Sequence, residues 1–175
     1  MNKVSSTART VYLASDGFGQ PLLEAIEKYL KEKSGIAVKN LGSEAYYDAA
    51  ANLASTLQKD ESPESAGILF CGTGMGVGIV ANKFDGVRAA VCENTMAAKY
   101  SRAVNNANVL CLGKLITPPD EAKRIVDCFL SQKFIQVPLD AEGKPVDWWT
   151  ENTEKFLSTS MDGISKVEER AKNKK

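Results

Sequence analysis

The chain has 175 residues, of which 43% are hydrophobic, and this length and composition fit one domain with a substantial core. It carries 22 lysines and arginines against 22 aspartates and glutamates, so its net charge gives no reason to expect binding to nucleic acid or to an acidic membrane surface. It contains no histidine and no run of about 18 apolar residues, which excludes imidazole catalysis and a membrane-spanning helix.

The first half of the chain alternates short apolar runs with helical patterns. The run at Thr10–Ser15 is typical of a buried strand, and Pro21 then opens a helix with an apolar face. A second strand is expected at Ile36–Leu41, an alanine-rich helix at Tyr47–Leu57 and a third strand at Ala66–Cys71.

The same alternation continues in the second half. The expected elements are a helix, a strand, a helix, a strand and a helix, at Val77–Lys83, Gly86–Cys92, Thr95–Ala103, Asn108–Leu112 and Pro118–Ser131. Apolar strands separated by helices predict a parallel sheet covered on both faces, which is a doubly wound α/β fold. We expect the strand order 2-1-3-4-5, because it puts the first and third strands beside the crevice where such folds bind ligands.

The pattern changes after about residue 135. The segment Gln136–Trp149 contains two prolines, one glycine and two tryptophans, and predicts an irregular stretch that wraps the surface or covers a pocket. Glu151–Asn173 predicts a polar, weakly amphipathic helix, followed by a basic tail. We therefore expect an α/β domain over residues 1–135 and, over residues 136–175, an extension that packs on the same domain.

The four cysteines, at positions 71, 92, 111 and 128, form no C-x-x-C pair, so neither a zinc site nor a thioredoxin-like motif is predicted. Three of them lie in or at the end of apolar runs, where a cysteine behaves as a small hydrophobic residue. The N-terminus lacks the apolar stretch of a secretory signal. We expect a cytoplasmic protein with reduced thiols and without a metal or cofactor.

The strongest functional signal is the glycine-rich stretch Gly72–Gly78, which leaves a strand and enters a helix. Closely spaced glycines let the backbone turn tightly and point several N–H groups into one concavity, and the following helix adds positive potential. A nest of this kind suits a phosphate or a developing oxyanion. The alternative is an ordinary turn in which the glycines serve only packing.

Two nucleotide-binding motifs compete with this interpretation. A dinucleotide fingerprint needs G-x-G-x-x-G, but the third glycine falls one residue early, at Gly76, and the stretch follows the third expected strand instead of the first. Glu93 lies at about the distance expected of a ribose-binding acid, so this hypothesis stays open. A Walker A motif is excluded because no Gly-Lys-Ser/Thr follows.

Without histidine, a general base must be a cysteine, aspartate, glutamate, lysine or tyrosine. Cys71 stands at a strand end beside the glycines and a helix N-terminus, a position that favours its thiolate and would make it a usable base. The alternative is a buried structural cysteine, which is the role expected of the other three.

Three further polar residues are candidates for binding. Asp16 ends the first strand, where it either orients a substrate hydroxyl or only shapes the turn. Asn105 belongs to a cluster of asparagines before the fifth strand, for which turn formation is the competing explanation. Lys114 follows that strand and either holds a phosphate or is merely solvated.

Two longer stretches resemble ribose-5-phosphate isomerase B and its galactose-6-phosphate isomerase relatives. They are Gly67–Ala90, with the combination CGTGxG, ANK and GxRAA, and Ser101–Gly113. Asp16 and Tyr46 fit the same pattern, and the resemblance covers roughly residues 10–135. It implies a Rossmann-like three-layer sandwich, homodimers whose active sites are shared between subunits, and isomerisation of a sugar phosphate between aldose and ketose through a cis-enediolate.

The resemblance also implies roles for single residues. Cys71 would be the base that moves a proton between C1 and C2, Thr73 would support it, and the backbone amides of Gly72–Gly76 would stabilise the enediolate as an oxyanion hole does. The other residues would hold sugar hydroxyls, the reacting oxygens or the phosphate. The complete set expected to bind the substrate is Asp16, Gly17, Tyr46, Gly72, Gly74, Met75, Gly76, Asn105 and Lys114.

The chain departs from the family at three places. The first loop of the family carries Asp-His, with the histidine at the phosphate, where this chain has Asp16 and Gly17. The ring-opening histidine is replaced by Val104, and the arginines beyond the last core helix are absent from Gln136–Pro145. A plant branch of the family that is linked to DNA-damage toleration is similar in lacking the first histidine.

These departures leave three hypotheses. An isomerase without a ring-opening residue favours a short or acyclic sugar phosphate, because a four-carbon sugar phosphorylated at O4 cannot close a furanose ring. The second hypothesis is a sugar-phosphate-binding or regulatory homologue that kept the fold and lost catalysis, since loss of a general acid–base costs about 10²–10⁴ in rate. The third is a dinucleotide-binding protein.

Overall fold

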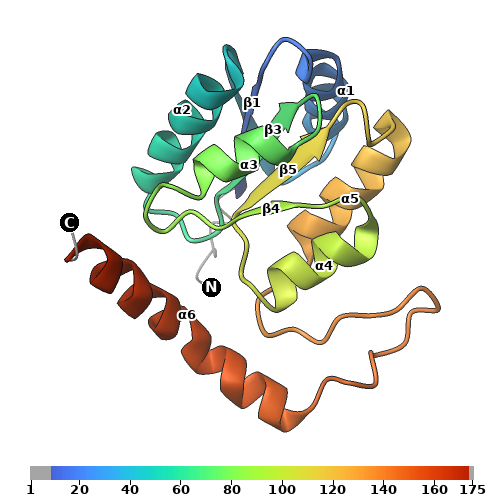
Figure 1. Ribbon diagram of the computed structural model, residues 1–175. Coiled ribbons are helices and arrows are strands. Elements are labelled where there is room, and N and C mark those ends of the chain that lie inside the picture. Colours follow the sequence, from blue (N-terminus) through green and yellow to red (C-terminus); the bar gives the residue numbers. More distant parts are fainter. Residues whose placement is uncertain (1–8, 174–175) are drawn as a thin grey trace, which may run out of the picture.

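The computed structural model describes residues 9–173 as a three-layer α/β sandwich followed by a long C-terminal helix (Figure 1). The expectations for a leader and for the last two lysines concern residues outside this range. The elements are β1 (Arg9–Ser15), α1 (Gln20–Lys31), β2 (Ile36–Ser43), α2 (Tyr46–Gln58), β3 (Ala66–Cys71), α3 (Met75–Ala81), β4 (Ala89–Val91), α4 (Thr95–Ala103), β5 (Val109–Gly113), α5 (Pro119–Ser131) and α6 (Glu151–Lys172).

The five strands form one parallel sheet in the order β2-β1-β3-β5-β4. The predicted doubly wound parallel α/β fold is therefore confirmed, as is the position of β1 beside β3. The predicted order 2-1-3-4-5 is wrong in its last two strands. All five residues of β5 are buried, and this strand pairs with β3 on one side and β4 on the other. A fully buried apolar strand is stabilised by neighbours on both sides, which leaves the partly exposed β4 at the edge.

β4 is also shorter than the predicted strand at Gly86–Cys92. Gly86 has a φ angle of +73°, which is a turn conformation, and the amide of Arg88 donates to the side-chain oxygen of Asn108 instead of a strand partner. The other predicted helices and strands occur within two residues of the expected limits, including β2, which extends two residues beyond Leu41 to Ser43.

The helices cover both faces of the sheet. Buried side chains from α1, α4 and α5 form one core with alternate residues of the strands, such as Leu13 and Phe70. Those from α2 and α3 form the second core with the intervening residues, such as Ala14 and Cys71. Cys71 therefore lies on the α2–α3 side of the sheet, at the carboxyl end of a central strand.

The C-terminal helix α6 lies below the amino-terminal edge of the sheet, at the end of a long irregular segment (Figure 1). Thr150 caps its first turn, Leu157 is buried, and Lys172 forms an ion pair with Asp85. None of the helices within residues 9–173 is long and apolar enough to cross a membrane. The division of the chain near residue 135 stays a prediction.

Candidate active site

Three loops converge at the carboxyl ends of β1, β3 and β5. The amide of Asp16 donates to the carbonyl of Phe70 at 3.1 Å, which joins the first loop to the end of β3. The amides of Lys114 and Leu115 donate to the carbonyls of Cys71 and Gly72, both at 2.9 Å, which joins the third loop to the second. The loops enclose a pocket of about 300 Å³ at the crevice between β1 and β3.

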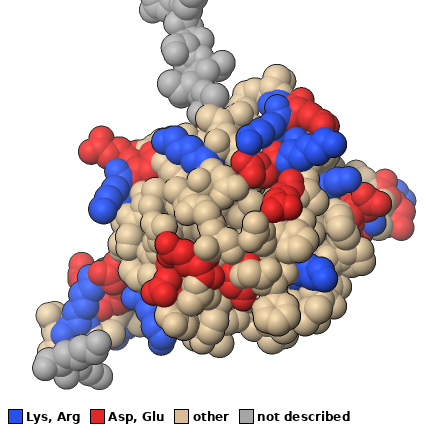
Figure 2. Space-filling model, turned by 90° about the horizontal axis from the view of Figure 1, so that it is seen from above, with Lys and Arg blue, Asp and Glu red and all other residues tan. Residues whose placement is uncertain are grey.

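Eight residues line this pocket, and six of them were predicted from the sequence. The predicted residues brought together here are Asp16, Tyr46, Cys71, Gly72, Thr73 and Gly76. Four other predicted residues, Gly17, Gly74, Met75 and Lys114, are sequence neighbours of lining residues but do not line the pocket themselves. Figure 2 looks onto this edge of the sheet, where much of the surface is uncharged and the charged side chains lie in scattered groups.

Cys71 is the buried group of the pocket. Its side chain follows the strand into the α2–α3 core and is 4% exposed. The backbone N–H of Gly74 donates to Cys71 Sγ at 3.0 Å, which fixes the sulfur within the pocket lining. Gly74 has a φ angle of +79°, a left-handed conformation that glycine adopts without a steric penalty, and this turns its N–H back toward the sulfur.

The other three cysteines pack in or against the two hydrophobic cores. Burial raises the pKa of the thiols of Cys92, Cys111 and Cys128, so each stays protonated near neutral pH. None of the three lines the pocket. They fit the structural role that the sequence predicted for them.

Two polar side chains of the lining are positioned by local hydrogen bonds. Asp16 Oδ1 accepts the N–H of Gly19 at 2.8 Å, which fixes the first loop and leaves Oδ2 for a ligand. Thr73 Oγ1 accepts the N–H of Met75 at 3.4 Å, a long bond that leaves the hydroxyl proton free to donate. Within residues 9–173, the amides of Gly72 and Thr73 have no acceptor outside regular secondary structure.

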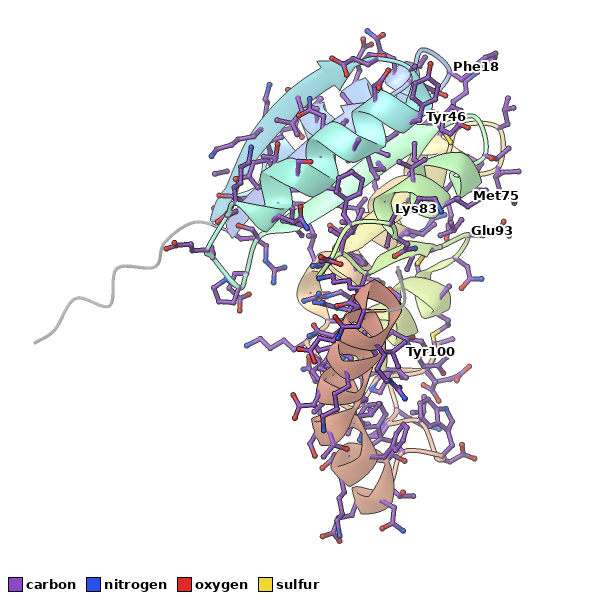
Figure 3. The ribbon with its side chains drawn as sticks, turned by 60° about the vertical axis from the view of Figure 1, so that its left-hand side comes forward. Phe18, Tyr46, Met75, Lys83, Glu93 and Tyr100 are labelled. Carbon is purple, nitrogen blue, oxygen red and sulfur yellow. The ribbon has the colours of Figure 1, made fainter. Side chains whose placement is uncertain are left out.

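Tyr46 enters the pocket from the first turn of α2. A Cβ atom added to Gly76 would lie 3.1 Å from two carbons of the Tyr46 ring, so the ring packs directly on the glycine backbone. In Figure 3, Tyr46 and Phe18 lie near each other at the carboxyl edge, whereas Tyr100 lies much closer to α6. Tyr46 is thus positioned across the pocket from the first loop.

Sequence reasoning missed two lining residues, Phe18 and Leu115. Both could have been predicted from their positions, because Phe18 is two residues beyond Asp16 and Leu115 is two residues beyond the end of β5. Their side chains are apolar, whereas the sequence prediction of the site rests on groups that exchange protons or bind anions. Their exposure makes them distinctive: the relative exposed areas are 70% for Phe18 and 65% for Leu115.

The structure does not bring Asn105 to the Cys71 pocket within one chain. Asn105 follows α4 and precedes β5, so it lies at the amino edge of the sheet, about 16 Å away along a five-residue strand. There it lines a groove of about 640 Å³ together with Val104 and one face of α6. The ring-opening position and its asparagine neighbour are therefore both remote from the thiol of the same chain.

The tryptophans of the irregular segment do not cover the pocket. The ring centroid of Trp148 lies 5.6 Å from that of Tyr100 on α4 and 5.5 Å from that of Trp149. This segment therefore follows the surface beside α4, one of the two courses predicted for it.

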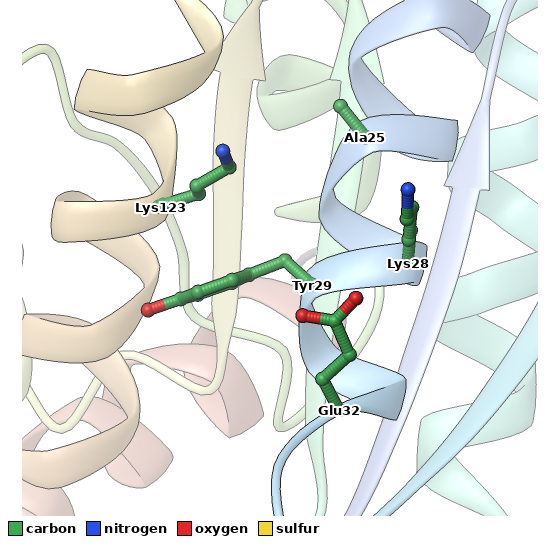
Figure 4. A pocket seen from close by; sticks show the side chains of 5 residues that line it. All are labelled: Ala25, Lys28, Tyr29, Glu32 and Lys123. Carbon is green, nitrogen blue, oxygen red and sulfur yellow. The ribbon is translucent and has the colours of Figure 1, made fainter.

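A third depression, of about 310 Å³, lies between α1 and α5 (Figure 4). Lys28, Glu32 and Lys123 surround Tyr29 there, and the Tyr29 hydroxyl donates to Asp127. The charges in this depression are already paired or solvated, and none of the predicted site residues lies in it. No group of three or more cysteines and carboxylates gathers within residues 9–173 as a metal ion would require.

Comparison with protein families places these features in context. The model of the family described as Ribose/Galactose Isomerase matches residues 11–140, which include all the pocket loops and every strand except the first two residues of β1. The chain belongs to the ribose/galactose isomerase family. It is a member without histidine: Gly17 and Val104 occupy positions that the resemblance gave to histidines, whereas the glycine-rich stretch Gly72–Gly78 is present.

Several proteins of known name are similar to this member of the ribose/galactose isomerase family. "DNA damage-repair/toleration protein DRT102" of Arabidopsis thaliana is 32% identical over 157 residues, and the chain spans about half of that protein (90% of this chain, 49% of the relative). A 4-deoxy-4-sulfo-D-erythrose isomerase of a Clostridium species is 38% identical, over 72% of this chain and 81% of the relative. A D-erythrulose-4-phosphate isomerase of Pectobacterium atrosepticum is 35% identical, over 71% of this chain and 84% of the relative.

Among solved structures, ribose-5-phosphate isomerase B of Mycoplasma genitalium with bound ribulose-5-phosphate superposes with a TM-score of 0.76. The sequences are 31% identical, and the match covers 93% of this chain and 98% of the other. The likeness therefore includes most of the C-terminal extension as well as the α/β sandwich.

Proposed function

We propose that this chain isomerises a sugar phosphate between its aldose and ketose forms, with Cys71 as the base. The observation that carries the proposal is the Cys71 thiol at the pocket floor, with Sγ 3.0 Å from the amide nitrogen of Gly74. Asp16 and Tyr46 are the other lining groups that can exchange a proton, but both are more exposed. A buried base is shielded from water, which suits the abstraction of a proton from carbon.

The proposed reaction begins when the Cys71 thiolate takes the proton from C2 of the aldose. The electron pair left behind forms the C1–C2 double bond of a cis-enediolate, and negative charge collects on the oxygen of C1. The proposed donors to that oxygen are the backbone amides of Gly72 and Thr73, which line the pocket. The Cys71 thiol then returns its proton to C1. The proton on the C2 oxygen moves to the C1 oxygen, a transfer for which Asp16 and Tyr46 are suited, and a carbonyl is left at C2.

We propose that the preferred substrate has four carbons. Val104 cannot open a sugar ring, and a tetrose phosphorylated at O4 has no ring to open because the oxygen that would close a furanose is blocked. Two relatives named for the four-carbon compounds 4-deoxy-4-sulfo-D-erythrose and D-erythrulose-4-phosphate support this choice. Lys114 is the proposed contact for the terminal anion, since it is exposed directly beside the Cys71–Gly72 backbone.

We propose further that the protein acts as a homodimer with shared sites. Cys71 and Asn105 can act on one substrate only if they come from different chains, because they lie at opposite edges of the sheet. The face of α6 beside Asn105 is apolar and exposed at Phe156, Ile164 and Val167 (70%, 41% and 54%). A second copy of the chain would remove this apolar surface from water.

A deuterium experiment tests the isomerase. The protein is incubated in D₂O with erythrose 4-phosphate or ribose 5-phosphate. Label at C1 of the ketose and at C2 of the aldose re-formed by the reverse reaction is followed together with kcat/KM. We expect label and turnover with erythrose 4-phosphate, loss of both in Cys71→Ala by about 10²–10⁴-fold, and no change in the control Cys128→Ala, whose thiol lies outside the pocket. A clear preference of the wild type for ribose 5-phosphate would contradict the four-carbon assignment.

Mixing two inactive variants tests the shared site. If the sites are shared, a dimer of one Cys71→Ala chain and one Asn105→Ala chain has one intact site, so random exchange of subunits restores about a quarter of the wild-type activity. If each chain holds a complete site, no activity returns after mixing.

A second candidate function is a sugar-phosphate-binding or regulatory homologue without catalysis. The observation in its favour is that Asp16 is the single charged residue of the pocket lining, so within one chain the lining offers no cation to a phosphate. Thermal stabilisation by a sugar phosphate, without any deuterium at C1 or C2, would support this function against the isomerase.

A further inference from the structure

The mouth of the Cys71 pocket is apolar on two sides. Phe18 comes from the loop after β1 and Leu115 from the loop after β5, and both line the pocket. They are among the most exposed large hydrophobic residues of the described chain, at 70% and 65%. Such exposure costs free energy in the unliganded protein, and a ligand whose carbon chain covers both side chains recovers it.

Both side chains approach the same residue, Gly72. A Cβ atom added to Gly72 would lie 3.7 Å from Leu115 Cδ1 and 3.9 Å from Phe18 Cβ, so the two side chains flank the glycine that follows the thiol. We call Phe18 and Leu115 together the apolar clamp.

The backbone holds the apolar clamp in place from both sides. The N–H of Leu115 donates to the carbonyl of Gly72 at 2.9 Å. On the other side, the carboxylate of Asp16 accepts the N–H of Gly19 at 2.8 Å, which fixes the loop that carries Phe18. These bonds fix the backbone positions from which the two side chains project on either side of Gly72.

The chemistry of the apolar clamp bears on the length of the substrate. Each CH–OH unit that a sugar gains brings one more hydroxyl, and neither phenyl nor isobutyl carbon can accept or donate a hydrogen bond. A hydroxyl pressed against such a surface loses its bonds to water without replacement. Apolar sites reject an added hydroxyl by about 10²-fold at most, so the expected discrimination is about 10- to 100-fold.

We propose that the apolar clamp of Phe18 and Leu115 determines specificity, by accepting four-carbon substrates and rejecting five-carbon substrates whose extra hydroxyl would be buried against it. This inference rests on the proposed isomerase function and assigns its substrate preference to two residues that take no part in the proton transfers. The preference is then a property of the pocket mouth as well as of the missing ring-opening histidine.

The test measures the ratio of kcat/KM for erythrose 4-phosphate to kcat/KM for ribose 5-phosphate. In Phe18→Ala and Leu115→Ala we expect this ratio to fall about 10-fold, because water reaches the fifth carbon. In Leu115→Asn it falls further, because an amide can pair with the extra hydroxyl. Gly72→Ala changes the ratio in the opposite direction, since the added methyl group fits at contact distance and narrows the same space.

The matched control is Ile79→Ala, which removes the same number of carbons as Leu115→Ala from a side chain that is 64% exposed and lies outside the pocket. Its ratio should equal that of the wild type. Equal ratios in the wild type, Phe18→Ala, Leu115→Ala and Leu115→Asn would overturn the apolar clamp while leaving the isomerase intact.

Absence of turnover in the wild type would show that the proposed isomerase function is wrong, and this outcome is distinct from failure of the apolar clamp. If the wild type turns over neither substrate, the same ratio is measured for the dissociation constants of the two sugar phosphates by calorimetry. A 10-fold change in that ratio in Leu115→Ala supports the apolar clamp in a binding protein. Unchanged affinities, or no binding of either compound, would overturn it.

Discussion

The substitution Gly74→Ala should reduce both activity and stability, because Gly74 both completes a turn and orients Cys71. Its φ angle of +79° is unfavourable for alanine, and its N–H donates to Cys71 Sγ. An added Cβ would lie 3.0 Å from the carbonyl carbon of Leu112 and 3.1 Å from the nitrogen of Gly113. Both contacts are with the backbone of the central strand β5, which cannot rotate away.

The magnitude follows from two contributions. An alanine in the left-handed region costs about 1 kcal/mol relative to glycine. Tight contact with backbone atoms adds about 1–3 kcal/mol, as in other overpacked sites. The loss of unfolding free energy in Gly74→Ala should therefore be about 2–4 kcal/mol. Because the loop moves away from β5 to relieve the contact, the amide is displaced from Sγ, and kcat/KM should fall about 100-fold.

Gly86→Ala is the matched control for this prediction. Gly86 has a similar φ angle of +73°, but a Cβ added to it meets no atom within 4 Å and it does not line the Cys71 pocket. It should lose about 1 kcal/mol of stability and keep its activity. Urea unfolding followed by circular dichroism, at one protein concentration, gives the stabilities, and turnover of erythrose 4-phosphate gives the activities. Equal losses in the two variants, in either measurement, would refute the reasoning.

Three other predictions concern parts of the fold around the site. The Tyr12 hydroxyl donates to Asp60 at 2.7 Å, which raises the pKa of Tyr12 to about 12. The stability that this hydrogen bond contributes is therefore complete below about pH 10 and is lost as the pH rises through 12. Tyr12→Phe should lower the free energy of unfolding by about 1 kcal/mol at pH 7 and remove this alkaline dependence in urea unfolding. The Asn82 side chain donates to the carbonyl of Ala89 at 2.9 Å and accepts the N–H of Ala89 at 2.8 Å. Asn82→Ala should therefore lower the free energy of unfolding by about 1–2 kcal/mol. Asn82→Asp, whose side chain can only accept, should have a stability between that of Asn82→Ala and that of the wild type in the same unfolding assay. Phe156→Asp should place a charge on the apolar face of α6 and yield monomers by light scattering with much reduced activity, whereas a fully active monomer would contradict the shared site.

Most of the fold was predictable because its signals are local. Buried runs such as the one in β3 are apolar at every position, which marks a strand covered on both faces, and Pro21 marks the first turn of a helix. The strand order was not predictable in full, because the choice between β4 and β5 for the edge depends on pairing across the sheet. The relative burial of the two strands gives the reason afterwards: β5 is fully buried and β4 is not.

The pocket was predictable for a different reason. Parallel strands direct all their carboxyl ends to one edge, so Asp16 after β1 and Gly72 after β3 had to be neighbours once the two strands were placed side by side. Phe18 and Leu115 follow the same rule. They were missed because their contribution is one of shape and exclusion of water, which composition does not reveal.

The common direction of parallel strands also explains why Asn105 lies far from Cys71, although the sequence predicted both as site residues. Asn105 precedes a strand and Cys71 ends one, so in a parallel sheet they belong to opposite edges, separated by the length of the strand. Nothing in the packing of one chain can bring them together, since β3 and β5 are hydrogen-bonded in register from Gly67 to Cys71. A mechanism that needs both residues on one substrate therefore requires two chains. The complementation proposed for Cys71→Ala and Asn105→Ala rests on this separation of the two residues within one sheet.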